Sequence, residues 1–178
     1  MNVQATMHAG RAIEELQFAI GESSLGFVLV AQSGKGICAV LLDSDPRALT
    51  RDLQNRFPNA TLIGSDSQLE NLVAKVVTFV EDPWRDLDVP LDVRGTEFQQ
   101  RVWKALGAIP VGSTASYSDV ANKIGLPKSF RAVAQACAAN ALAVVIPCHR
   151  VVSSDGALSG YHWGVDRKRN LLKREAAL

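Results

Sequence analysis

The stretch Val144-Val145-Ile146-Pro147-Cys148-His149-Arg150-Val151-Val152 places a cysteine, a histidine and an arginine between two short apolar runs. β-Branched residues dominate both runs, a composition typical of buried extended chain. Pro147 has no N–H and a fixed φ, so a regular strand ladder must break there. We therefore predict a bent, rigid backbone that holds Cys148 in an apolar setting beside an imidazole and a guanidinium.

Cys148 is a candidate nucleophile because the thiolate is the reactive form of cysteine. Nearby cationic or hydrogen-bonding groups can lower the pKa of a thiol from about 8.5. A buried cysteine in a core strand can equally act as a small hydrophobic residue. The adjacent cysteine and histidine do not by themselves separate these two interpretations.

Composition limits the classes of protein that the chain can represent. Its 178 residues, 47% hydrophobic and 21% charged, suit one large folded domain or two small ones. No apolar run approaches the roughly 20 residues that span a membrane. Met1–Gly10 lacks the basic segment and apolar run of a secretory signal. Three cysteines are too few for a disulfide framework, so we expect a reducing, cytoplasmic location.

The two halves of the chain differ in charge. Residues 1–94 hold 8 Lys and Arg against 13 Asp and Glu, a net charge of −5. Residues 95–178 hold 11 against 5, a net charge of +6. A basic half favours contact with a polyanion, because neutralised phosphates release their counterions.

The first half predicts a small sheet covered by helices. Apolar runs separated by Gly and Ser turns indicate a β-meander over residues 16–20, 25–31 and 36–42. Asp45 as N-cap and Pro46 at the first helical position predict a helix that continues to about Phe57. Helical spacing of apolar residues predicts a second helix over Ser67–Glu81, and a proline-containing linker follows over residues 82–94.

The second half predicts mostly helices. Thr96–Ile109 carries an amphipathic stripe in which we expect Phe98 and Trp103 to be core residues. Residues 116–136 predict two short helices joined by a glycine-containing turn, a helix-turn-helix pattern. The second of these helices is rich in alanine and offers few groups to read base edges. A Gly- and Ser-rich loop over residues 152–164 and a last helix over residues 165–176 complete the chain.

These motifs resemble those of the DNA O6-alkylguanine alkyltransferases, most closely the C-terminal alkyltransferase domain of the bacterial Ada protein. The likeness covers residues 91–175 and rests on several motifs in order. They are Arg94-Gly95-Thr96-Glu97-Phe98-Gln99-Gln100-Arg101-Val102-Trp103, Ser116-Tyr117, Arg131-Ala132-Val133-Ala134, Asn140, Ile146-Pro147-Cys148-His149-Arg150-Val151-Val152, Ser159-Gly160-Tyr161, Trp163-Gly164 and Arg174-Glu175.

The resemblance implies a mixed α/β (α+β) fold. A small ribonuclease H-like sheet-and-helix subdomain with its linker would occupy residues 1–94. A mostly helical subdomain with the helix-turn-helix would occupy residues 95–178.

The resemblance also implies direct-reversal DNA repair, by irreversible transfer of a methyl or other alkyl group to Cys148. The substrate would be O6-methylguanine in DNA, and also O4-methylthymine, flipped out of the duplex. His149 would activate the thiol through a water, Glu175 would orient His149, and the thioether product would make the protein act once. The catalytic residues implied in this way are Cys148, His149, Glu175, Asn140, Tyr117 and Lys168.

The same resemblance assigns the contacts to substrate and DNA. The implied DNA-binding residues are Arg131, Tyr117, Ser118, Ala132 and Arg150. The implied substrate-pocket residues are Tyr161, His162, Trp163 and Val151. Most Ada-like sequences have arginine where this chain has His162, and the bulk of Trp163 suggests a tight pocket that favours methyl over benzyl groups. The expected partner is double-stranded DNA bound without sequence preference by a monomer, with no cofactor, no metal and no membrane contact.

Two other classes of function remain possible from the residues alone. Cys148, His149 and Glu175 could form the triad of a cysteine hydrolase, although an adjacent cysteine and histidine are poorly placed for direct proton transfer. Residues 116–139 could belong to a DNA-binding regulator without enzymatic activity. A metal site is disfavoured, because the sequence has no Cys-x-x-Cys motif and no spaced histidine pair.

Overall fold

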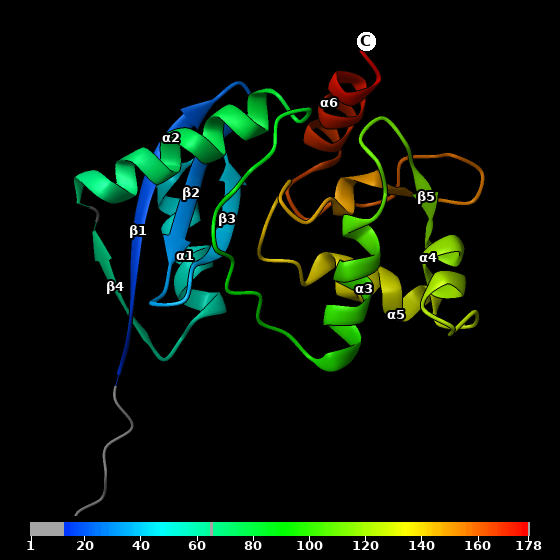
Figure 1. Cartoon of the computed structure of the whole chain (residues 1–178), viewed down its shortest axis with the longest axis horizontal. Helices are drawn as coiled ribbons and strands as arrows, with labels where there is room; N and C mark the ends of the chain where they lie inside the picture. Colours follow the sequence, from blue (N-terminus) through cyan, green and yellow to red (C-terminus); the bar gives the residue numbers. More distant parts are fainter. Residues whose placement is uncertain (1–12, 65, 178) are drawn as a thin grey trace, which may run out of the picture.

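The computed structural model describes residues 13–64 and 66–177 and shows a sheet-containing subdomain beside a mostly helical one (Figure 1). This arrangement confirms the expected mixed α/β class. Met1–Gly10, on which the prediction of no secretory signal rests, lies outside the described residues. Within the described ranges, no helix combines the length and the apolar character needed to cross a membrane.

The N-terminal subdomain is built on a four-stranded sheet with the strand order β3-β2-β1-β4. Strands β1 (Glu14–Ser23), β2 (Gly26–Gln32) and β3 (Ile37–Asp43) pair antiparallel, which confirms the predicted β-meander. Strand β4 (Ala60–Gly64) pairs parallel to β1 and was not predicted. It is short and only partly buried, and its pairing with β1 is distant in sequence, so no local pattern marks it.

Two helices pack on this sheet as predicted. Helix α1 (Pro46–Arg56) packs on β2 and β3, and its N-cap Asp45 accepts a hydrogen bond from the Arg47 N–H. Helix α2 (Ser67–Glu81) packs on β1 and β2. Gly21 of β1 permits this close approach, because a Cβ there would lie 2.7 Å from a methyl carbon of Val73.

A linker leads from α2 to the C-terminal subdomain and runs between the two halves of the molecule (Figure 1). Helix α3 (Glu97–Gly107) begins with a capping box in which Thr96 and Gln99 satisfy each other's backbone N–H groups. Trp103 is buried and Phe98 packs partly buried against the same core, so both are core residues as expected.

The predicted pair of short helices is present. Helix α4 (Tyr117–Lys123) follows the two-residue strand β5 (Ala115–Ser116) and leads through a turn to α5 (Phe130–Ala138). Gly125 in that turn has a φ of +78°, a conformation that favours glycine. The last helix, α6 (Val165–Ala176), packs against the segment that holds Cys148.

The prediction of extended chain across residues 144–152 is wrong for its first part. Residues 142–147 form successive tight turns, Cys148–Arg150 form the short 3₁₀-helix η1, and only β6 (Val151–Val152) is a strand, paired with β5. Val144 has a φ of 66°, which is strained for a β-branched residue. A composition typical of strands was overridden here by the hydrogen bonds of Asn140, described below.

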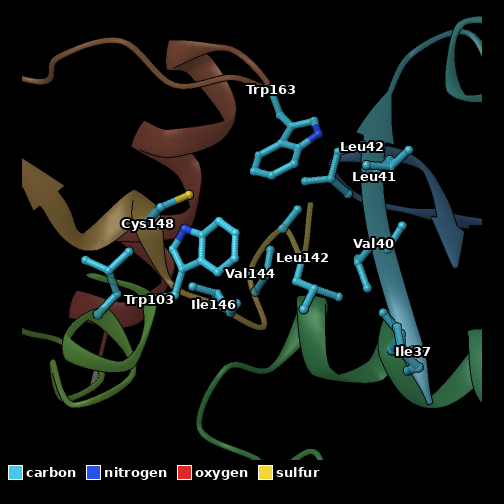
Figure 2. Packing of buried hydrophobic residues seen from close by; sticks show 14 of the residues in the cluster. Ile37, Val40, Leu41, Leu42, Trp103, Leu142, Val144, Ile146, Cys148 and Trp163 are labelled. Atoms are coloured by element: carbon cyan, nitrogen blue, oxygen red, sulfur yellow. The ribbon is translucent and has the colours of Figure 1, made fainter. Parts of the chain in front are cut away.

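The turn segment also joins the two subdomains. The N–H of Val40 on β3 donates to the carbonyl of Ala141 at 2.8 Å, and the N–H of Ala143 donates back to Val40 at 2.9 Å. Figure 2 shows the buried side chains around this junction, with Leu142 and Val144 between β3 and the region of Cys148. The segment that carries Cys148 is therefore built into the core that both subdomains share.

Candidate active site

Cys148 lies at the start of η1 with 4% of its surface exposed. The Nδ2 of Asn140 donates to the carbonyl of Ile146 at 3.0 Å and lies 3.3 Å from the Cys148 Sγ. The Oδ1 of Asn140 accepts from the N–H of Leu142 at 2.9 Å. A single buried amide thus closes the turn and directs a donor at the sulfur. The N–H and carbonyl groups of a buried turn need such hydrogen-bond partners.

The residue after Cys148 belongs to a buried ionic cluster. The Nε2 of His149 lies 2.7 Å from a carboxylate oxygen of Glu175, and Arg150 donates to both oxygens of that carboxylate at 3.0 Å. Arg150 also donates to the carbonyl of Ile109 at 2.8 Å. All three side chains are almost fully buried, and a buried carboxylate requires this kind of pairing.

Burial and pairing set the protonation of these groups. Desolvation by burial raises the pKa of Cys148 to about 11, against the opposing effect of the Asn140 hydrogen bond. Burial also lowers the pKa of His149, although Glu175 opposes this. For Glu175, burial favours the neutral acid, but hydrogen bonds from His149 and Arg150 outweigh it and lower the pKa. The resting site therefore holds a neutral thiol, a neutral imidazole and a carboxylate.

A cavity of about 430 Å³ opens onto Cys148. Helix α5 forms one wall and the loop before α6 forms the other. The lining residues are Tyr117, Ala134, Cys137, Ala138, Cys148, Ser159, Gly160, Tyr161 and His162. The size and the mainly small side chains suit a flat ligand of the size of a nucleobase.

A second hydrogen-bonded chain lies along the wall of this cavity. The Nζ of Lys168 is buried and donates to the carbonyl of Val151 at 2.6 Å and to the Ser159 hydroxyl at 3.3 Å. The Ser159 hydroxyl in turn lies within hydrogen-bond distance of the Tyr117 hydroxyl. Burial lowers the pKa of Lys168 and raises the pKa of Tyr117.

The predicted pocket residues are only partly brought together. Tyr161 and His162 line the cavity, but Trp163 and Val151 do not. The Trp163 ring is buried and points toward Leu42 of β3 (Figure 2), so it serves the junction between the subdomains. Val151 is fully buried in β6 and contributes its carbonyl to Lys168. The expectation of a tight pocket thus loses its basis in Trp163.

Of the predicted DNA-binding residues, four are at least partly exposed and one is buried. Arg131 is exposed near the start of α5, and Tyr117, Ser118 and Ala132 are partly exposed on the same pair of helices. Arg150 does not fit its assignment, because the residue is 6% exposed and its guanidinium is bound to Glu175. It belongs to the internal ionic cluster.

Sequence reasoning missed several lining residues. Ala134, Ser159 and Gly160 belong to the family motifs but were assigned no role, and no motif included Cys137 and Ala138. The spacing of i, i+3 and i+4 along α5 could have found Ala134, Cys137 and Ala138, because it places them on one face of the helix.

Fold and site together define a two-subdomain α/β protein with a buried cysteine site beside a helix-turn-helix. Residues 97–177 match the family described as 6-O-methylguanine DNA methyltransferase, DNA binding domain. Over 162 residues the chain is 36% identical to the inducible methylated-DNA–protein-cysteine methyltransferase of Bacillus subtilis, covering 91% of this chain and 86% of that protein. The chain belongs to the methylated-DNA–protein-cysteine methyltransferase family.

Two further similarities concern a longer relative and a solved structure. The chain is 49% identical over 176 residues to the Escherichia coli bifunctional transcriptional activator/DNA repair enzyme Ada, covering 99% of this chain and 49% of that protein. It therefore spans about half the length of that relative and of its Salmonella typhimurium counterpart. The crystal structure of Mycobacterium tuberculosis OGT in complex with DNA aligns with a TM-score of 0.76 at 33% identity, covering 92% of this chain and 93% of that one.

Proposed function

We propose that this protein repairs alkylated DNA by direct reversal, moving the methyl or alkyl group from O6-methylguanine, and from O4-methylthymine, to Cys148. The observation that carries this proposal is the placement of the Cys148 Sγ at a base-sized cavity, 3.3 Å from the Asn140 Nδ2 and next in the chain to the His149–Glu175 pair. The family membership supports the same reaction.

The histidine is in the tautomer that a general base requires. An ionised carboxylate only accepts hydrogen bonds, so the Nε2 of His149 must carry the proton that faces Glu175. The Nδ1 of His149 then has a free lone pair, and it has no hydrogen-bond partner among the described residues. The proton of the Cys148 thiol passes through a water to this Nδ1, and Glu175 stabilises the imidazolium that forms.

The displacement then proceeds in line at the alkyl carbon. A bond forms between the Cys148 Sγ and that carbon while the bond from carbon to O6 breaks, and the electron pair stays on the guanine. Lys168 donates to Ser159, and the Ser159 hydroxyl can donate to the Tyr117 oxygen, which leaves the Tyr117 proton free for the leaving base. Tyr117 regains its proton from solvent, and His149 returns the thiol proton to solvent. The thioether remains, so each molecule acts once.

The base must leave the duplex to reach the buried sulfur. Base flipping costs a few kcal/mol, and least where the pairing is already damaged. The exposed Arg131 lies on α5, the helix that also forms a wall of the cavity, so it can fill the space that the base leaves. Tyr117 and Ser118 of α4 would contact phosphate, and Ala132 would allow close approach.

We also infer the setting of this activity. The few side chains able to read bases on α5 favour double-stranded DNA without sequence preference. We expect a monomer that acts in the cytoplasm on the nucleoid, without a cofactor. The division of the chain at residues 94 and 95 belongs to the same proposal.

The test is intact-mass measurement and peptide mapping after incubation with duplex DNA that carries one O6-methylguanine. We expect one methyl group on Cys148 in one-to-one yield. Cys148→Ala should take up none, and Cys137→Ala should retain the reaction, because Cys137 lines the same cavity but lacks the Asn140 contact. Restored guanine with unmodified protein would indicate a turnover enzyme. DNA binding without repair would favour a regulator.

A further inference from the structure

Helix α1 of the N-terminal subdomain reaches a wall of the cavity. The Nη2 of Arg56, the last residue of α1, lies 3.0 Å from the Nε2 of His162, which lines the cavity. The Nε of Arg56 donates to Asp52 at 3.0 Å, one turn earlier on the same helix. Asp52 therefore anchors the Nε side of the guanidinium on α1, while the Nη2 contacts His162 in the loop before α6.

The same guanidinium contacts the segment that directly follows helix α5, the helix of the opposite wall. The Nη1 of Arg56 lies 3.5 Å from the carbonyl oxygens of both Ala139 and Asn140, where α5 ends. Asn140 is the residue whose amide contacts the Cys148 sulfur. One side chain from the first half of the chain thus connects the pocket loop with the turn that holds the nucleophile.

The chemistry of the guanidinium sets the direction of the hydrogen bond between Arg56 and His162. A guanidinium has donors only, so the Nε2 of His162 is the acceptor in this contact. Asp52 also faces this nitrogen, with its Oδ2 at 3.6 Å. The Oδ1 of Asp52 accepts from the Arg56 Nε at 3.0 Å, and the pKa of Asp52 is lowered, so Asp52 stays ionised as the anchor of Arg56.

We propose that Arg56, anchored by Asp52, is a positioning residue that sets the location of the pocket loop at His162 and thereby the rate of alkyl transfer. This inference rests on the proposed function and deepens it. It gives the N-terminal subdomain a part in the chemistry. It also gives a reason for His162, because an arginine there could not accept from Arg56 and two guanidinium groups would repel.

The experiment compares single-turnover rates of methyl transfer from O6-methylguanine duplex DNA, together with the Kd for that DNA. For Arg56→Ala we expect a rate about tenfold lower with the Kd unchanged within about twofold, since small misplacements of reacting groups are costly. Arg56→Lys should recover part of the rate. Arg51→Ala is the control, because Arg51 is an exposed arginine on the same helix. Thermal unfolding of each variant verifies that it is folded.

Two substitutions of His162, each made alone and together with Arg56→Ala, test the pairing itself. His162→Ala should lower the rate to the level of Arg56→Ala, and the double variant should lose no more, because the two changes remove one contact. His162→Arg should also lower the rate, and adding Arg56→Ala to it should restore part of the loss. Independent, additive losses would overturn the proposal, as would an Arg56→Ala variant as fast as Arg51→Ala. A rate loss explained entirely by a weaker Kd would make Arg56 a DNA contact instead.

A second readout separates this proposal from the proposed function. Labelling of Cys148 by iodoacetamide, mapped by peptide mass, requires no DNA. A displaced loop should make labelling several-fold faster in Arg56→Ala than in Arg51→Ala. A wild-type protein that transfers no methyl group would refute the proposed function alone. Equal labelling of both variants would then refute the positioning role as well.

Discussion

At the scale of single residues, Glu175 is the charge on which the site depends. It is 1% exposed, and its two oxygens accept hydrogen bonds from His149 and Arg150. The interaction places an anion, a neutral base and a cation in one buried cluster. Such a cluster is strongly destabilised when one partner loses its charge, because the remaining charge stays buried without compensation.

We expect Glu175→Gln to reduce the free energy of unfolding by about 3–5 kcal/mol, because Arg150 would keep a buried charge without an anion. Urea unfolding measures this change. The control is Asp166→Asn, whose exposed pair with Arg169 should contribute less than about 1 kcal/mol. Equal effects of the two substitutions would contradict the assignment of Glu175 to a buried ionic cluster.

Acid should destabilise the protein through the same cluster. The folded-state pKa values of both Glu175 and His149 are lowered, so their contribution is complete above the unfolded-state values. The contribution from His149 is lost as the pH falls below about 6.5, and that from Glu175 below about 4.3. Urea midpoints measured between pH 7 and pH 4 should fall steadily. A rise in the midpoint over this range would refute this account.

Sequence alone could identify Cys148, Asn140 and Glu175, because their motifs are distinctive. It could not predict which partners the side chains of Arg150 and Trp163 contact. Both lie within or near those motifs, yet one pairs with Glu175 and the other packs toward Leu42. Proximity in sequence to a reactive residue says nothing of the direction in which a side chain leaves the backbone.

At the scale of elements, local capping signals predicted where helices begin, but the sequence did not predict pairing between distant segments. Asp45 and Pro46 begin α1 as their chemistry predicts. Strand β4 escaped prediction because its partner β1 lies more than thirty residues earlier. The turns at residues 142–147 escaped because a buried amide from outside the segment satisfies their carbonyls.

The capping box of α3 offers a direct test at this scale. Thr96→Ala should cost about 1 kcal/mol, since the N–H of Gln99 loses its acceptor. Thermal or urea unfolding measures the loss. Thr114→Ala is a suitable comparison, because Thr114 is exposed and lies outside any helix, so a change within about 0.5 kcal/mol is expected there. The capping role would be wrong if both substitutions cost the same.

At the scale of the whole molecule, α6 joins the two subdomains through arginine side chains. Arg167 donates to the carbonyl of Leu25 at 2.7 Å, and Arg174 donates to the carbonyl of Val80 and to the Ser24 hydroxyl. These contacts connect the last helix to the turn between β1 and β2 and to the end of α2. They hold the N-terminal subdomain against the helix that carries Glu175 and Lys168 of the site.

Arg174→Ala should therefore lower the free energy of unfolding by about 1.5–3 kcal/mol, the usual contribution of hydrogen bonds that involve a charged group. Lys173→Ala, next in the chain and exposed, should change it by less than about 0.5 kcal/mol. Urea unfolding of both variants gives the comparison. A small effect at Arg174 would mean that apolar packing alone holds the subdomains together.

The pairing of Val40 with residues 141–143 has one more consequence, for self-association. Strand β3 is an outer strand of the sheet, and its backbone bonds to the turn before Cys148 occupy groups that would otherwise be free. An uncovered strand edge is a template for pairing with other chains. A fragment that ends at residue 94 would expose this apolar edge, and we expect it to aggregate. The segment that leads to Cys148 thus also keeps this strand edge from pairing with other chains.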